Sequence, residues 1–200
     1  MQRFTEFDFG VSWVMTFFHE DWCFDGPTAS DVVAKWLAYP DAEYVLAVRR
    51  DAQTLLDGLP TKTLEVLWEA GTDYLPPFAL ISGAQWTQTV VDLCDARLSS
   101  TTDVRPFTGV DANDGAACLD AVVAEIQQVR SLETEVTAAL VDCARRCTPD
   151  LALRLLLRVI TAVPGVSLSS DQYARLESIG SALQYGEFVV DSVEYLVKDE

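Results

Sequence analysis

The chain has 200 residues, half of them hydrophobic, and a formal net charge of −17 at pH 7. This length and composition are sufficient for one or two folded domains with a buried core. No apolar stretch reaches the roughly 18 residues that a membrane span needs, and the first residues lack the basic and then apolar layout of a signal peptide. We therefore expect a cytoplasmic protein without a membrane partner.

The acidic excess extends over the whole chain, with 6 basic and 15 acidic residues up to Ser100 and 8 basic and 16 acidic residues after it. A negative field of this kind repels nucleic acids and speeds the association of basic partners. It is also typical of bacterial cytosolic proteins whose acidity serves solubility. The charge leaves both interpretations open, but it makes nucleic acid an unsuitable partner.

Apolar residues recur with the period of a helix along the first half of the chain. The first clear helical pattern begins at Thr28, directly after a proline, and ends at Pro40. Asp41 is expected to cap the next helix, which ends at Gly58. These apolar patterns predict helices over residues 28–39, 42–58, 61–71 and 84–98, with a loop over 72–83.

The second half shows the same periodicity after a stretch of small and polar residues. Thr148, Pro149 and Asp150 form a helix start, because proline suits the first helical position and an acid suits the positive end of the dipole. Ser169 or Ser170 is expected to cap the following helix. The stripes predict helices over 116–130, 132–146, 149–163 and 169–183, and a last segment over 187–197.

The predicted fold class is all-α, with two consecutive small helical bundles and no substantial sheet. The bundles span residues 1–98 and 116–200, and residues 99–115 form a connector because they combine small, polar, proline and glycine residues. Three tryptophans at helical spacing are expected in the core. They are Trp36, Trp68 and Trp86.

The cysteines and the single histidine do not predict a metal site or a disulfide framework. The five cysteines are scattered, and a reducing cytosol would keep them as thiols. Cys143 and Cys147 could share a helix face, but a zinc site needs four Cys or His ligands and no CxxC pair is present. No cofactor is expected either, since glycine-rich phosphate loops are absent.

His19 lies beside two carboxylates, Glu20 and Asp21, and could act with one of them in acid–base chemistry. The other parts of a catalytic site are missing, because the chain has neither a G-x-S-x-G nucleophile turn nor an H-E-x-x-H metal motif. We therefore expect a protein that is not an enzyme. An enzyme that uses His19 stays as an alternative.

The residues around His19 also have a purely structural interpretation. Phe17, Phe18 and Trp22 would bury large aromatic areas. Asp21 could cap the turn that follows, and His19 could bond to a backbone group. On this interpretation Trp22 belongs to the core.

The string Phe17-Phe18-His19-Glu20-Asp21-Trp22 opens a segment that closes on Ser82-Gly83-Ala84-Gln85-Trp86 and a last apolar helix. Residues 10–98 thereby resemble the immunity proteins of bacterial contact-dependent growth inhibition systems. In that family an F-H-x-D-W string precedes several helices and a final helix that carries a tryptophan. The acidic helix start near Asp31 and the pair Leu55-Leu56 also match.

The second half lies outside this resemblance. Its ending, with Tyr185-Gly186-Glu187-Phe188 before a Val-Glu-x-Leu segment, bears a looser resemblance to helical immunity proteins of the MafI type. Both resemblances imply a cytoplasmic, non-catalytic protein that binds and neutralises a cognate toxin domain. Many such toxins are nucleases, whose basic grooves an acidic inhibitor can occupy. The remaining alternative is an acidic mimic of nucleic acid.

The partner-binding residues expected from this interpretation are exposed acids near the motif and on its facing loop. They are Glu20, Asp25 and Asp73, with Tyr74 as an aromatic anchor, since binding hot spots favour tyrosine. A face with Asp191 and Glu194 is the second choice.

Overall fold

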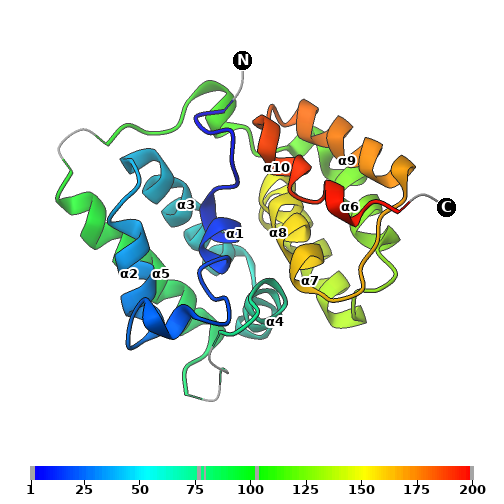
Figure 1. Ribbon diagram of the computed structural model, residues 1–200. Coiled ribbons are helices and arrows are strands. Elements are labelled where there is room, and N and C mark those ends of the chain that lie inside the picture. The colour runs from blue at the N-terminus through cyan, green and yellow to red at the C-terminus, as the bar shows by residue number, and fades with distance from the viewer. Residues whose placement is uncertain (1–2, 76–77, 79, 102–103, 199–200) are drawn as a thin grey trace. The chain divides into compact units, whose positions relative to one another are not determined.

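The chain was analysed as a computed structural model that describes residues 3–75, 78, 80–101 and 104–198. Within these ranges it consists of helices joined by loops, so the all-α prediction is confirmed (Figure 1). The described residues contain no strand, only an isolated bridge between Leu168 and Val197. Part of the predicted loop over 72–83, namely residues 76, 77 and 79, lies outside the description.

The chain divides into two compact units. We call residues 9–106 the inserted unit, and Met1–Asp8 together with Phe107–Glu200 the terminal unit. This grouping differs from the predicted contiguous ranges, because residues 3–8 pack with the second half of the chain. The chain therefore passes from one unit to the other twice.

The inserted unit contains five α-helices, and the longest two, α3 and α5, pack against each other. The shorter helices pack on this pair. The α-helices are α1 (Gly10–Met15), α2 (Ala29–Leu37), α3 (Ala42–Gly58), α4 (Thr61–Gly71) and α5 (Gly83–Ser99). A 3-10 helix, η1 (Trp22–Phe24), follows α1. The sequence missed α1 because its six residues are too few to show a helical period.

Tryptophan packing fills the centre of the inserted unit. Trp68 is fully buried and donates its indole N–H to the Thr87 hydroxyl at 3.0 Å. Trp86 is buried as well and meets Trp68 edge to face, with ring centroids 5.8 Å apart. Both rings lie in the core as predicted, whereas Trp36 is only half-buried.

Capping side chains set several helix starts. Thr28 caps α2, and Ser82 with Gln85 forms a reciprocal capping box at α5. Asp41 stands at the cap position of α3, but its side chain makes no capping hydrogen bond, so that part of the prediction was wrong.

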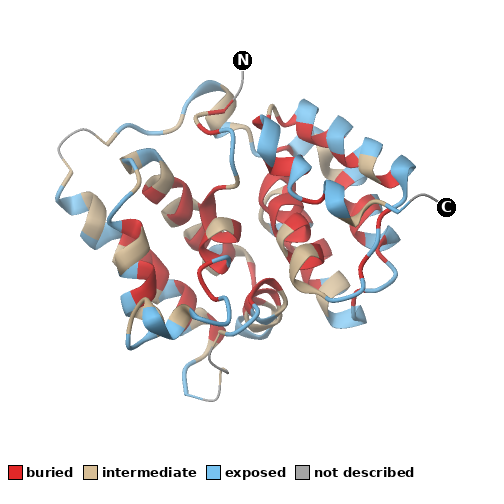
Figure 2. Ribbon diagram, viewed as in Figure 1, coloured by how far each residue is buried: buried red, intermediate tan, exposed pale blue. Residues whose placement is uncertain are grey.

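The terminal unit contains α6 (Leu119–Gln128), α7 (Thr134–Arg146), α8 (Pro149–Ala162), α9 (Ser170–Ala182) and α10 (Glu187–Asp191). Three 3-10 helices complete it: η2 (Gly109–Ala112), η3 (Ala116–Cys118) and η4 (Glu194–Leu196). Most residues of α8 are buried, as Figure 2 shows, so α8 is the core helix of this unit.

Two helix starts predicted in the second half, at Thr148 and at Ser169 or Ser170, are present. The Thr148 hydroxyl accepts the Leu151 N–H, and Pro149 is the first residue of α8. Of the two candidates for the cap of α9, Ser169 is the one used. The predicted last segment over 187–197 does not form one helix, because α10 ends at Asp191 and η4 follows.

A buried group of charges joins the N-terminal residues to α8. Asp150, at the start of α8, forms ion pairs with Arg3 and Arg154, each at 2.9 Å. The Tyr185 hydroxyl donates to the same carboxylate at 2.8 Å. All these side chains are buried. Burial, followed by the charge of Asp150, raises the pKa of Tyr185 well above its ordinary value, so the phenol stays a donor.

Residues 3–8, which we call the strap, pack along the segment between α9 and α10 near the C-terminal end. The Arg3 guanidinium also donates to the backbone oxygens of Leu183 and Asn113, at 3.0 and 2.9 Å. The Phe188 N–H donates to the Glu6 oxygen at 2.9 Å. The strap therefore binds through both backbone and side chain, and residues far apart in the sequence complete one unit.

Replacing Arg3 with alanine should destabilise the whole protein. It removes one of the two guanidinium groups that neutralise the buried Asp150, and breaking a buried pair from one side costs about 3–5 kcal/mol. Because Arg154 still bonds to Asp150, we expect a loss of about 3 kcal/mol in the free energy of unfolding, measured by urea denaturation.

The matched control is Arg130→Ala, because Arg130 is exposed in the same unit. It should change the free energy of unfolding by no more than about 0.5 kcal/mol. Equal denaturation midpoints for the two variants would show that the pair between Arg3 and Asp150 contributes nothing to stability.

Candidate functional site

The motif residues lie where the chain leaves the core of the inserted unit. Phe17 and Phe18, directly after α1, are buried. His19 and Glu20 follow and are exposed. The aromatic half of the string therefore anchors the polar half at the surface.

Two hydrogen bonds hold this turn to the segment after α4. The Tyr74 N–H donates to the Phe18 backbone oxygen at 3.2 Å, and the Trp22 indole N–H donates to the Tyr74 backbone oxygen at 2.8 Å. The Trp22 ring also meets Phe18, with centroids 5.9 Å apart. The motif and its facing loop, which the sequence could only suggest as neighbours, are thus joined directly.

The structure corrects two details of the structural interpretation of the motif. Trp22 is half-buried rather than a core residue, because its indole bonds to a surface loop. Asp21 does not cap η1 with its side chain. His19 does bond to a backbone group as predicted, since its Nδ1 accepts the Asp21 N–H at 3.2 Å.

Three of the four predicted partner-binding residues lie exposed around this junction. Glu20 is on the turn, Asp73 is exposed beside Tyr74, and Tyr74 exposes 55% of its surface although its backbone is bonded at both ends. An exposed tyrosine on a fixed backbone loses little entropy when it binds, which suits a contact residue.

Asp25, the fourth predicted residue, is engaged within the chain. Its carboxylate accepts a hydrogen bond from the Lys35 ammonium at 2.7 Å, and His19 Nε2 lies 3.9 Å away. The bond from Lys35 lowers the pKa of Asp25 below its usual range. Asp25 therefore positions the turn against α2 more than it offers a charge to a partner.

The sequence missed one exposed aromatic residue at this place. Phe24, in η1 two residues after Trp22, is 83% exposed. The signal that could have found it is the polar and turn-forming stretch Asp25-Gly26-Pro27 that follows, which keeps the chain at the surface. We call Glu20, Phe24, Asp73 and Tyr74 the motif surface.

The His19 side chain contacts a backbone N–H and, at 3.9 Å, the Asp25 carboxylate. Among the described residues the imidazole hydrogen-bonds to the Asp21 N–H, and no hydroxyl or thiol bonds to it. A histidine that activates a nucleophile needs one within hydrogen-bond reach.

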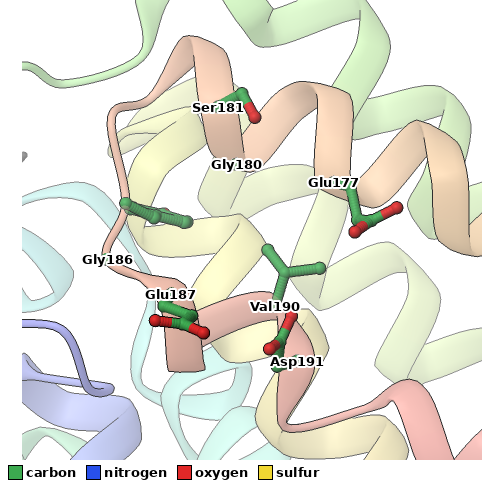
Figure 3. Close-up of a pocket in the computed structure, with 8 residues that line it drawn as sticks. Glu177, Gly180, Ser181, Gly186, Glu187, Val190 and Asp191 are labelled. Carbon is green, nitrogen blue, oxygen red and sulfur yellow. The ribbon is translucent and has the colours of Figure 1, made fainter.

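A second feature is a pocket of about 210 Å³ in the terminal unit. Figure 3 shows it between α9 and α10, with Glu177 on one helix and Glu187 and Asp191 on the other (Figure 3). Nowhere in the described part of the chain do three or more His, Cys, Asp or Glu side chains converge to hold a metal ion. The volume is also below the roughly 300–1,000 Å³ of sites for small-molecule ligands.

No helix in the described ranges is long and apolar enough to span a membrane. Comparison with known proteins found no matching family model, no matching curated protein and no matching solved structure.

Shortening Trp22 to alanine should cost about 1–3 kcal/mol of unfolding free energy, since the ring loses one hydrogen bond and one edge contact. Trp22→Phe keeps an aromatic ring at this position but removes the indole N–H, so it should cost less than alanine, about 0.5–1.5 kcal/mol. Thermal and urea unfolding measure both. Glu20→Ala is the exposed control and should stay within about 0.5 kcal/mol of the parent.

If Trp22→Ala unfolded like the parent, the bond between the motif and the loop at Tyr74 would be unimportant for stability. If Trp22→Ala instead lost as much unfolding free energy as the truncation of a fully buried tryptophan, Trp22 would belong to the core as first predicted.

Proposed function

We propose that this chain is an immunity protein that binds and neutralises a cognate bacterial toxin domain in a one-to-one complex. The observation that carries the proposal is the motif surface. There, two hydrogen bonds join the F-H-x-D-W string to the loop at Tyr74, and exposed acidic and aromatic side chains lie on both segments. The resemblance of residues 10–98 to immunity proteins of contact-dependent growth inhibition systems supplies the class of partner.

The composition of the motif surface supports a protein partner. Phe24 and Tyr74 offer large exposed aromatic area, and such residues dominate the binding energy of protein interfaces. Glu20 and Asp73 are exposed acids of the same surface and can orient a basic partner. The two hydrogen bonds through Trp22 and Tyr74 fix the backbone before binding, which lowers the entropy cost of the complex.

The charge of the chain supports a toxin with a basic surface, and a nuclease fits best. A nuclease groove that binds phosphates is positively charged, and the net charge of −17 steers this chain towards it. Neutralisation then needs no turnover, because a bound inhibitor blocks the active site or the substrate surface. No cofactor takes part in this function.

The first test is co-expression with the toxin domain encoded beside this chain. We expect growth to be restored, and titration of the purified pair to show one chain silencing one toxin. The stoichiometry separates the alternatives: silencing by far less than one equivalent would indicate an enzyme. An acidic mimic of nucleic acid would instead inhibit unrelated nucleases equally well.

The second test reverses the charges of the motif surface. Glu20→Lys with Asp73→Lys should slow association with the toxin about tenfold or more at low salt, and leave folding intact, because both side chains are exposed. The control is Asp57→Lys with Asp92→Lys, two exposed acids on α3 and α5 with the same total change in charge.

Stopped-flow association kinetics compare the two double variants. Equal slowing would mean that only the net charge matters and that the motif surface is not the site. Unchanged association of the first variant would move the site elsewhere, and the face of Asp191 and Glu194 would be examined next.

A further inference from the structure

Two glycines that line the pocket between α9 and α10 allow a close approach of the neighbouring elements. A Cβ atom at Gly180 would lie 2.6 Å from a methyl group of Val190 on the facing helix. A Cβ atom at Gly186 would lie 2.2 Å from the Glu6 Cα atom in the strap. A side chain at either position would clash, so both glycines determine how closely these elements approach each other.

The floor and the rim of this pocket differ in character. We call the buried lining residues Tyr185 and Val190 the floor, and the exposed lining residues Glu177, Glu187 and Asp191 the rim. Figure 3 shows the three carboxylates of the rim beside the pocket. Two contacts hold the Tyr185 ring of the floor in place: its hydroxyl donates to Asp150, and the Arg3 guanidinium lies 5.1 Å from its ring centroid. A preformed floor of this kind lowers the cost of binding.

The carboxylates of the rim have no cationic partner in the described part of the chain. Asp191 accepts a hydrogen bond from the Tyr173 phenol at 3.2 Å, and no Lys or Arg pairs with Glu177, Glu187 or Asp191. The two buried acids of the same unit are paired, Asp150 with arginines and Glu125 with Arg175. Among the described residues of this unit, the buried acids are paired with arginines, whereas the three exposed acids around the pocket are not.

The charges of the rim contribute to the raised pKa of Tyr173. Burial, followed by the charges of Asp191 and Glu177, raises the pKa of this phenol to about 12. A group next to the pocket therefore experiences the combined negative potential of these carboxylates, which would stabilise a cation in the same place.

An exposed aromatic pair lies next to the rim. Phe7 of the strap and Phe188 of α10 are stacked, with ring centroids 5.0 Å apart, and they remain 58% and 42% exposed. Phe188 follows Glu187 directly in α10. An exposed stacked pair beside unpaired acids resembles the aromatic centre of a protein interface more than a solvated face.

We propose that the pocket between α9 and α10 binds one lysine or arginine side chain of a protein partner, whose neighbouring apolar residue packs on Phe7 and Phe188. The volume of about 210 Å³ suits one long side chain rather than a cofactor. The negative rim excludes phosphates and nucleic acid. This site lies in the terminal unit and is distinct from the motif surface, so it does not depend on the toxin proposal.

The test is an NMR titration of the full chain, labelled with ¹⁵N, with acetyl-arginine-amide. The matched probe is acetyl-citrulline-amide, which has nearly the same shape without the charge. We expect saturable shifts confined to residues 177–191 with the arginine probe and no saturation with citrulline. Equal shifts with both probes, or arginine shifts spread over acids of the whole chain, would overturn the proposal.

Variants locate the binding within the rim. Glu177→Gln with Asp191→Asn keeps the shapes and hydrogen-bonding capacity while removing two charges, and should weaken arginine binding about tenfold. Glu133→Gln with Glu135→Gln, two exposed acids at the start of α7, is the control and should leave the affinity within about twofold. If both double variants weakened arginine binding equally, the binding would depend only on net charge and the pocket would not be a specific site.

Two peptides test the aromatic part. Acetyl-Leu-Arg-amide should bind more tightly than acetyl-Gly-Arg-amide, because only the leucine can pack on the stacked rings. Equal affinities of the two peptides would show that Phe7 and Phe188 do not take part in binding.

Discussion

The buried carboxylate of Asp150 is the group on which the terminal unit depends. A negative charge in a core helix is costly unless it is paired and hydrogen-bonded. Here Arg154 comes from the next turn of the same helix, Arg3 from the beginning of the chain and Tyr185 from near its end. One carboxylate therefore holds together segments that no local interaction would bring into contact.

The same group prepares the functional features of the terminal unit. Tyr185 bonds to Asp150 with its hydroxyl and presents its ring to the pocket between α9 and α10. The strap that Arg3 anchors carries Phe7, which stacks on Phe188 next to the rim. The pocket and its aromatic neighbour are thus built on residues that the buried charges already fix.

Local patterns predicted most of the helices, because an amphipathic stripe and its caps are written within a few neighbouring residues. Thr148 and Ser169 are examples, since each cap bonds to a residue three positions on. The role of Arg3 could not be predicted, because it depends on contacts across about 150 residues or more. Trp22 was misassigned for a related reason: an indole that bonds to a distant loop looks like a core aromatic in the sequence.

The double passage of the chain between the units also orders events during synthesis. Arg3 precedes the inserted unit in the chain, whereas its partners Asp150 and Leu183 follow that unit and are made about 10–40 s after Arg3 at typical rates of translation. All residues of the inserted unit are synthesised within that interval. The bonds from Arg3 to Asp150 and Leu183 can therefore form only after the whole inserted unit has been synthesised.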